Sequence, residues 1–241
     1  MVAAKKTNKN NKLKKIGAQA NGPKPTRRSN VERTAETREK VIKAAVDNIY
    51  EVGYEGTSLN NVAARAGVSK GATQHHFPSK AELMVAVAEY CLELQVKIRN
   101  EIFLKYKPGV DRISHTAESS WKIVNDPSYI AFIEILMATR NNPELKTLCK
   151  PLNDLINSEI KLGEQAFCAD FNVEPNELLS TLIRTHVTAM RGIAVGLMFY
   201  PDQKEFLKEL EMMQSYERLM TKIIIEKHGN KKDKAETSAS A

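Results

Sequence analysis

The chain has 241 residues, of which 42% are apolar and 27% charged. It is therefore long enough for one large hydrophobic core, or for a small domain beside a larger one. No apolar run approaches the ~20 residues of a membrane-spanning helix, and residues 1–30 lack the apolar stretch of a secretory signal. The cysteines Cys91, Cys149 and Cys168 are too widely spaced to indicate a disulfide framework or a zinc cluster. We therefore expect a cytoplasmic protein with no membrane span.

The net charge of +7 is concentrated at the N-terminus. Residues 1–33 contain ten lysines and arginines but a single acid, Glu32, so the rest of the chain is slightly acidic. This pattern favours a polyanionic partner, although a solubilising or artificially added tail would have the same composition. Large apolar side chains are scarce in residues 1–33 and again in residues 229–241, so both segments are predicted to be disordered.

The first helix is predicted from Thr34 onward. Apolar residues recur at helical spacing on one face, namely Val41, Ala45, Ile49 and Val52. Gly53 follows directly and is typical of the residue that ends a helix.

Two short helices should follow. Thr57 or Ser58 is expected to cap the first, whose buried positions include Leu59 and Val62. After Gly67, Ser69 is expected to cap the second, which Pro78 ends.

The remaining pattern is also helical. Ser79 and Glu82 form a capping box that opens a long helix ending near Pro108-Gly109. Further helices are predicted at residues 110–124, 143–171 (with a bend at Pro151), 177–200 and about 203–227, the last opened by a capping box of Asp202 and Glu205. Residues 129–137 form a strongly apolar stretch. No segment has the alternating pattern of a strand, so the predicted fold class is all-α.

The segment from Leu59 to Phe77 has the features of a helix-turn-helix. Gly67 permits a tight turn between the two short helices. The sequence Ser69-Lys70-Gly71 gives the second helix a capped N-terminus that can approach a phosphate closely. Its next residues, Ala72 and Thr73, are short, and the amide of Gln74 can pair with adenine in a major groove. His75, His76 and Lys80 lie toward its far end, where backbone phosphates would be.

The stretch TREKVIKAAVDNIYEVGYEGTSLNNVAARAGVSKGATQHHFPSKAELM resembles the N-terminal domain of the TetR (tetracycline-repressor) family. The resemblance implies a three-helix DNA-binding domain at residues 34–80 and a larger helical ligand-binding and dimerisation domain at residues 81–228. It also implies a repressor that an inducer releases. Several residues match positions that typically face DNA in the family: Thr57, Lys70, Gly71, Ala72, His76 and Lys80.

The chain departs from the family at two positions of the recognition helix. Thr73 stands where the family usually has a large apolar residue, and Gln74 stands where it usually has a tyrosine. We therefore expect looser packing beneath this helix and an unusual operator. The full set of predicted DNA-binding residues is Thr57, Ser69, Lys70, Gly71, Ala72, Thr73, Gln74, His75, His76 and Lys80.

The middle helices of the family enclose the ligand, so an apolar cavity with a few orienting polar groups is expected there. The candidates for its lining are Trp121, Phe132, Ile133, Met137, Phe167, His186, Met190, Arg191 and Ile193. A structural role is at least as probable for His186 and Arg191. The composition weakly favours an aromatic or acyl-type inducer.

Residues 177–200 and 203–227 are where the family usually dimerises, and two-fold symmetry would make the operator palindromic. We expect no cofactor and no metal, because the side chains of adjacent His75 and His76 diverge on a helix. The sequence contains no phosphate loop, dinucleotide motif or serine elbow, so an enzyme is not expected. The alternative is an architectural or protein-partner-controlled DNA-binding protein without a small-molecule ligand.

Overall fold

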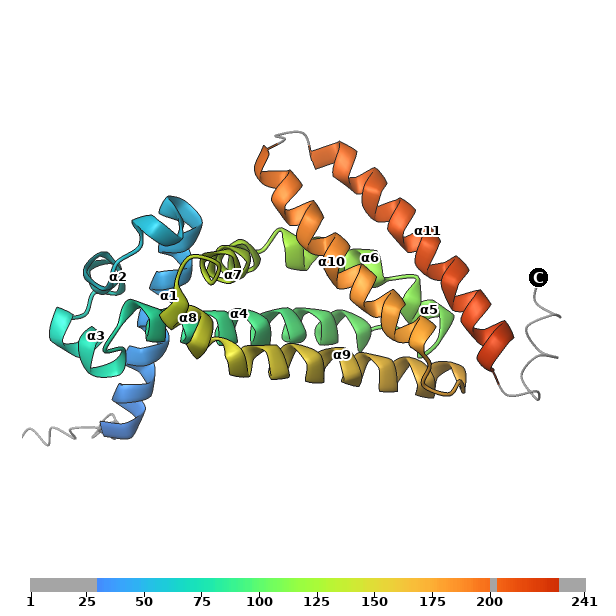
Figure 1. Ribbon diagram of the computed structural model, residues 1–241, viewed down its shortest axis with the longest axis horizontal. Helices are drawn as coiled ribbons and strands as arrows, with labels where there is room; N and C mark the ends of the chain where they lie inside the picture. Colours follow the sequence, from blue (N-terminus) through green and yellow to red (C-terminus); the bar gives the residue numbers. More distant parts are fainter. Residues whose placement is uncertain (1–29, 200–202, 230–241) are drawn as a thin grey trace, which may run out of the picture.

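The computed structural model describes residues 30–199 and 203–229, and the fold of this part is all-α, as predicted (Figure 1). The helices are α1 (Asn30–Gly56), α2 (Leu59–Ala66), α3 (Lys70–His76), α4 (Lys80–Phe103), α5 (Val110–Ile113), α6 (Thr116–Val124), α7 (Pro127–Ala138), α8 (Pro143–Leu148), α9 (Lys150–Phe171), α10 (Glu177–Phe199) and α11 (Gln203–His228). Within the described ranges, no helix combines the length and apolar character that a bilayer crossing requires.

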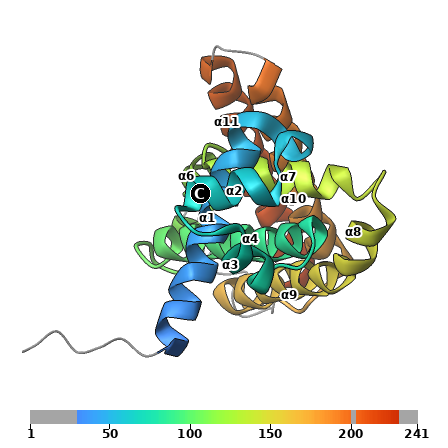
Figure 2. The ribbon, with the colours of Figure 1, turned by 90° about the vertical axis from the view of Figure 1, so that its left-hand side faces the viewer.

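The helices form an elongated molecule with two differing ends. Helices α1, α2 and α3 form one end, and α4 runs from there along the long axis beside α9 (Figure 1). Helices α10 and α11 cross the other part of the molecule. Seen end-on, α2 and α3 face outward (Figure 2). Helix α4 therefore extends from the three-helix end into the larger part of the molecule.

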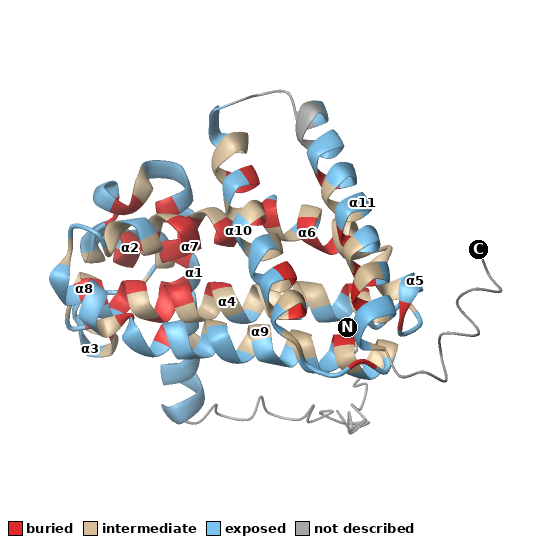
Figure 3. Ribbon diagram, turned by 45° about the vertical axis from the view of Figure 1, so that its right-hand side comes forward, coloured by how far each residue is buried: buried red, intermediate tan, exposed pale blue. Residues whose placement is uncertain are grey.

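Buried residues gather where α1, α4 and α7 meet (Figure 3). Helix α7 contributes Ala131 and Ile135, both fully buried, and packs against Ile49 of α1 and Met84 of α4 in one continuous core. Burying side chains of this size typically stabilises a fold by about 1.5–3 kcal/mol each. The core thus joins the small three-helix end to the larger helical part.

Helix α1 follows the predicted pattern until its last turn. Val41, Ala45 and Ile49 are fully buried, whereas Val52, predicted on the same face, is 56% exposed. The prediction for Val52 is wrong because Gly53, with φ 75° and ψ 170°, breaks the helix and turns the chain. Tyr54 enters the core in its place.

Replacing Gly53 by alanine is expected to lower the free energy of unfolding by about 1–3 kcal/mol, because its backbone conformation is accessible essentially only to glycine. A matched control is Gly163 in α9, where an added methyl group would meet nothing within 4 Å. Gly163→Ala should raise stability by about 0.5–1 kcal/mol. Urea unfolding of both variants measures the difference; an unaltered stability of Gly53→Ala would contradict the assignment of strain.

Three helix boundaries differ from those predicted. Helix α1 begins at Asn30, inside the segment expected to be disordered. The helix predicted over 110–124 is interrupted at Ser114 and His115, and the one predicted over 143–171 is divided at Cys149, two residues before Pro151. The predicted capping box of Asp202 and Glu205 is untested because Asp202 lies outside the described residues, as do residues 1–29 of the basic tail.

Candidate DNA-binding surface and ligand cavity

Helices α2 and α3 form a helix-turn-helix whose ends are defined by local hydrogen bonds. Ser58 caps α2: its hydroxyl accepts from the Asn61 N–H at 3.2 Å, and the Asn61 side chain accepts from the Ser58 N–H at 2.8 Å. Gly67 ends α2 in the left-handed conformation, with φ 66°. Ser69 then caps α3 by accepting from the Ala72 N–H at 3.1 Å. The short-range sequence signals therefore predicted this geometry correctly.

One face of α3 is open to solvent. Ser69, Lys70, Gly71, Gln74 and His75 are exposed. Ala72 and His76 are partly covered. Burial lowers the pKa of His76, and the neighbouring His75 and Arg38 lower it further. These seven residues lie at one end of the molecule, so a flat or grooved partner could reach them together (Figure 2).

Two predicted DNA-binding side chains lie inside the protein instead. Thr73 is fully buried, and its hydroxyl donates to the Ser69 carbonyl at 3.4 Å. Thr57 is 1% exposed and donates to the Gly53 carbonyl at 2.8 Å. This burial contradicts the prediction that their side chains contact DNA. The hydroxyl of each threonine donates a hydrogen bond to a nearby backbone carbonyl, so its burial costs little free energy.

Lys80 lies at the junction between α1 and α4. Its ammonium donates to the Tyr54 carbonyl at 2.7 Å and lies 4.2 Å from the centre of the Tyr54 ring. Burial lowers the pKa of Lys80. A phosphate contact, which the sequence predicted, would therefore compete with an intramolecular bond that holds α4 against the end of α1.

Tyr54 is also tied to the helices that follow. Its backbone N–H donates to Glu134 Oε2 of α7 at 2.5 Å, and its hydroxyl accepts from the Asn142 side chain at 3.2 Å. Together with Lys80, these contacts connect the break in α1 to α4, α7 and the start of α8. The three-helix end is thus held by polar contacts as well as by the core.

A cavity of about 610 Å³ lies in the larger part of the molecule, within the ~300–1,000 Å³ range typical of small-molecule sites. Its walls come from α4, α5, α6, α7, α9, α10 and α11. Most of the lining is aliphatic or aromatic, including Leu92, Val96, Phe103, Ile160 and Leu182. The lining is therefore mostly apolar.

Five of the nine predicted ligand-binding residues line this cavity: Phe132, Phe167, His186, Met190 and Arg191. The other four are not among the lining residues. Met137 is 65% exposed, while Ile133 and Ile193 are buried in the main core and Trp121 packs against that core. The helix pattern marked all four as apolar, but it could not separate a core-facing position from a cavity-facing one.

The cavity wall also contains ion pairs that the sequence did not predict. Arg99 donates to Glu159 at 2.8 Å, and Arg112 donates to both oxygens of Asp170 at 2.9 and 3.1 Å. Each pair joins residues about sixty positions apart in the chain, so no local pattern could have revealed it.

Glu217 forms a third polar cluster in the wall. It is 8% exposed, contacts His186 of α10 as an ion pair, and accepts from the Thr116 hydroxyl at 2.7 Å. His186 also contacts the Ser120 hydroxyl at 3.1 Å. Burial raises the pKa of Glu217, but the contacts with His186 and Thr116 outweigh it, so the net shift is downward. Glu217 was detectable in principle, because it interrupts the apolar stripe of Leu210, Met213, Met220 and Ile224.

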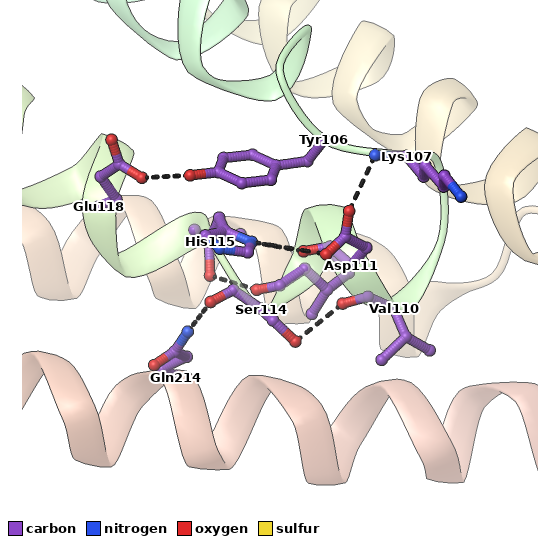
Figure 4. Close-up of polar contacts among 10 residues, drawn as sticks. Tyr106, Lys107, Val110, Asp111, Ser114, His115, Glu118 and Gln214 are labelled. Carbon is purple, nitrogen blue, oxygen red and sulfur yellow. Dashed lines mark hydrogen bonds and ion pairs between the residues drawn. The ribbon is translucent and has the colours of Figure 1, made fainter. Parts of the chain in front are cut away.

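The connection between α4 and α6 is held by polar and ring contacts (Figure 4). Tyr106 stacks on His115 with ring centres 3.4 Å apart and donates to Glu118 at 2.8 Å. The Ser114 carbonyl, at the interruption of the predicted helix, accepts from Gln214 of α11. The break at Ser114 therefore allows this connection to dock on α11. Among the described residues, no group of three or more His, Cys, Asp or Glu side chains could hold a metal ion.

Comparisons with known proteins agree with this architecture. Residues 41–87 match the family model described as bacterial regulatory proteins, tetR family. The chain is 34% identical to the HTH-type transcriptional regulator CymR of Pseudomonas putida over 185 residues, which cover 76% of this chain and 89% of the relative.

Two solved structures show the same fold. A TetR-family regulator from Rhodococcus sp. has a TM-score of 0.58 at 18% identity and covers 79% of this chain and 98% of its own. A regulator from Saccharomonospora viridis in complex with choline has a TM-score of 0.58 at 14% identity, covering 76% of this chain and 94% of its own.

Proposed function

The chain belongs to the tetR family of bacterial regulatory proteins and is a DNA-binding transcriptional regulator, and we propose that it is a cytoplasmic repressor that binds a palindromic operator as a dimer and leaves it when a small, largely apolar ligand binds. The observation that carries this proposal is the pairing of an exposed α3 face at one end with a partly open cavity in the other part of the molecule. Helix α4 lines the cavity and packs against α1 of the three-helix end.

The proposed DNA contacts divide into two kinds. Ser69, Lys70 and Gly71 at the start of α3 present backbone N–H groups and a positive charge to phosphate. Ala72 and Gln74 face a base edge in the major groove, where the Gln74 amide pairs with adenine. His75 and His76 reach the flanking backbone.

Dimerisation is proposed through α10 and α11. Both helices carry large apolar side chains that the described part of the chain leaves exposed: Met198, Phe199, Leu207, Met212, Tyr216 and Leu219. Pairing these helices with their copies would cover the exposed surface. A two-fold dimer would present two α3 helices to half-sites about 34–36 Å apart.

The proposed release is a population shift. The cavity is lined by Leu92 of α4 and Phe132 of α7, while other residues of these two helices, Lys80 and Glu134, hold Tyr54 at the end of α1. A ligand that favours a displaced position of α4 and α7 would change the spacing of the two α3 helices. A preference of ~3 kcal/mol for the displaced state would lower operator occupancy more than a hundredfold.

Gln74→Ala is expected to weaken binding to the preferred operator by about 1–3 kcal/mol, the value of a bidentate contact to a base. Because Gln74 is exposed, the fold should be unaffected. Fluorescence anisotropy on the operator, and on a variant with the contacted adenine replaced, measures the effect. The variant protein should bind the operator and the altered DNA with similar affinity. If it still prefers the operator as strongly as the wild type does, Gln74 does not contact that base.

The proposed function is tested by selecting bound fragments from random double-stranded DNA with the full chain at physiological salt. A palindrome of two half-sites supports a sequence-specific dimer and supplies the operator. Strong binding at low salt without enrichment would contradict the proposal and favour an architectural role, in which charge dominates affinity.

A further inference from the structure

One of the three arginines that line the cavity has no carboxylate partner among the described residues. The lining carboxylates are those of Glu159, Asp170 and Glu217. Each already has a basic partner in the wall. Arg191 also lines the cavity, and no carboxylate of the described residues lies within ion-pair distance of it. Within the described part of the chain, Arg191 is therefore the lining arginine whose charge a ligand could pair with.

Hydrogen-bond donors are in excess. Gln95 Nε2 and Arg112 Nε are buried at the cavity and have no partner within the described residues. Both atoms can only donate. The Thr221 hydroxyl, on a residue 4% exposed, lacks a partner too. Leaving buried donors unsatisfied costs about 1–3 kcal/mol each, so an acceptor-rich occupant would be favoured.

Tyr129 adds a donor near the unpaired cation. It is 4% exposed and lines the same cavity. Burial raises the pKa of Tyr129 to about 12, and the positive charge of Arg191 opposes this rise, which indicates that the two groups interact. At neutral pH the Tyr129 hydroxyl is therefore protonated and able to donate.

We propose that the ligand of this cavity is an apolar monocarboxylic acid in its ionised form, whose carboxylate binds Arg191 and whose body lies against the aliphatic and aromatic wall. A carboxylate accepts several hydrogen bonds and can pair with a guanidinium through two of them. A neutral ligand would leave Arg191 without a counter-charge, and an amine would be repelled by it. This inference rests on the proposed function and specifies its ligand class.

The test is a matched panel of octanoate, 3-phenylpropionate and 4-phenylbutyrate, each with its primary amide and its primary amine. Binding to the full chain is measured by calorimetry and by the shift in melting temperature at pH 7. At least one acid should bind and stabilise the protein, while its amide and amine bind much more weakly. Arg191→Gln should reduce the affinity for the acid about 10- to 100-fold, the usual effect of losing a charge-assisted contact.

Arg184→Gln is the matched control, because Arg184 is an exposed arginine on the same helix and is not among the cavity-lining residues. It should leave acid binding unchanged. The melting temperature of ligand-free Arg191→Gln should not fall, which separates lost binding from lost folding. Equal binding of acid and amide, binding of no acid in the panel, or full acid affinity in Arg191→Gln would each overturn the proposal.

Failure of this inference is distinguishable from failure of the proposed function. If the selection yields a palindromic operator but acids are not preferred as ligands, the proposed repressor function stands and only the ligand class is rejected. If an acid binds through Arg191 but no DNA sequence is enriched, the ligand class stands and the proposal of a specific operator is rejected.

Discussion

Replacing Phe77 by alanine is expected to lower the free energy of unfolding by about 3–5 kcal/mol and to abolish specific DNA binding at 37 °C. Phe77 is 3% exposed, directly follows α3, and its N–H donates to the Thr73 carbonyl at 2.9 Å to close that helix. Its ring belongs to the main core and lies 5.4 Å from the Arg38 guanidinium of α1. Truncation would leave a cavity between α3 and the helices that hold it.

The measurement combines chemical unfolding with operator binding. For the unfolding measurement His75→Ala is the control, because His75 is exposed two residues earlier and its loss should alter stability by no more than about 0.5 kcal/mol. Phe77→Ala with wild-type stability would show that α3 does not depend on this core contact.

The second large effect concerns Glu217. Glu217→Ala is expected to destabilise the protein by about 1–3 kcal/mol or more, because it leaves buried polar groups without the partner that Glu217 supplies. Glu217 joins α11 to His186 of α10 and to Thr116 of α6. Glu211→Gln, at an exposed position of the same helix, should cost far less.

The pH dependence of this contribution has a definite sign. The folded-state pKa of Glu217 lies below its ordinary value of 4.5. Its contribution to stability is therefore complete above about that pH and is lost as the pH falls through the lowered folded-state pKa. The stability difference between the wild type and Glu217→Gln should accordingly shrink on acidification below pH 4.5. A constant difference across this range would contradict the ion pair.

Local signals predicted the helix-turn-helix well. The caps Ser58 and Ser69 and the left-handed Gly67 depend only on residues a few positions away, so their geometry follows from the sequence. At Thr73 the prediction that failed is the DNA contact, because the side chain is fully buried. A threonine fits there because its hydroxyl bonds the preceding turn.

The cavity could be predicted only in part. Periodicity identifies apolar positions on α7 and α10, but Phe132 faces the cavity while Ile133 faces the core, and that difference depends on how the helices pack. The ion pairs of Arg99 and Arg112 join distant segments and have no local signature. Glu217 is the exception, since a carboxylate within an apolar stripe marks a buried polar site.

The central claim is that occupancy of the cavity changes the spacing of the two α3 helices. It can be measured by placing a spin label on each protomer at Asn60→Cys, an exposed position of α2, in a Cys168→Ser background. Cys91 and Cys149 are buried and should not react.

Distances are then compared for the free dimer, the operator complex and the protein saturated with the most tightly binding acid of the panel. The free protein is expected to sample the operator-bound spacing, and the ligand is expected to shift the distribution away from it. Identical distributions with and without ligand, at ligand concentrations that release the operator, would contradict it.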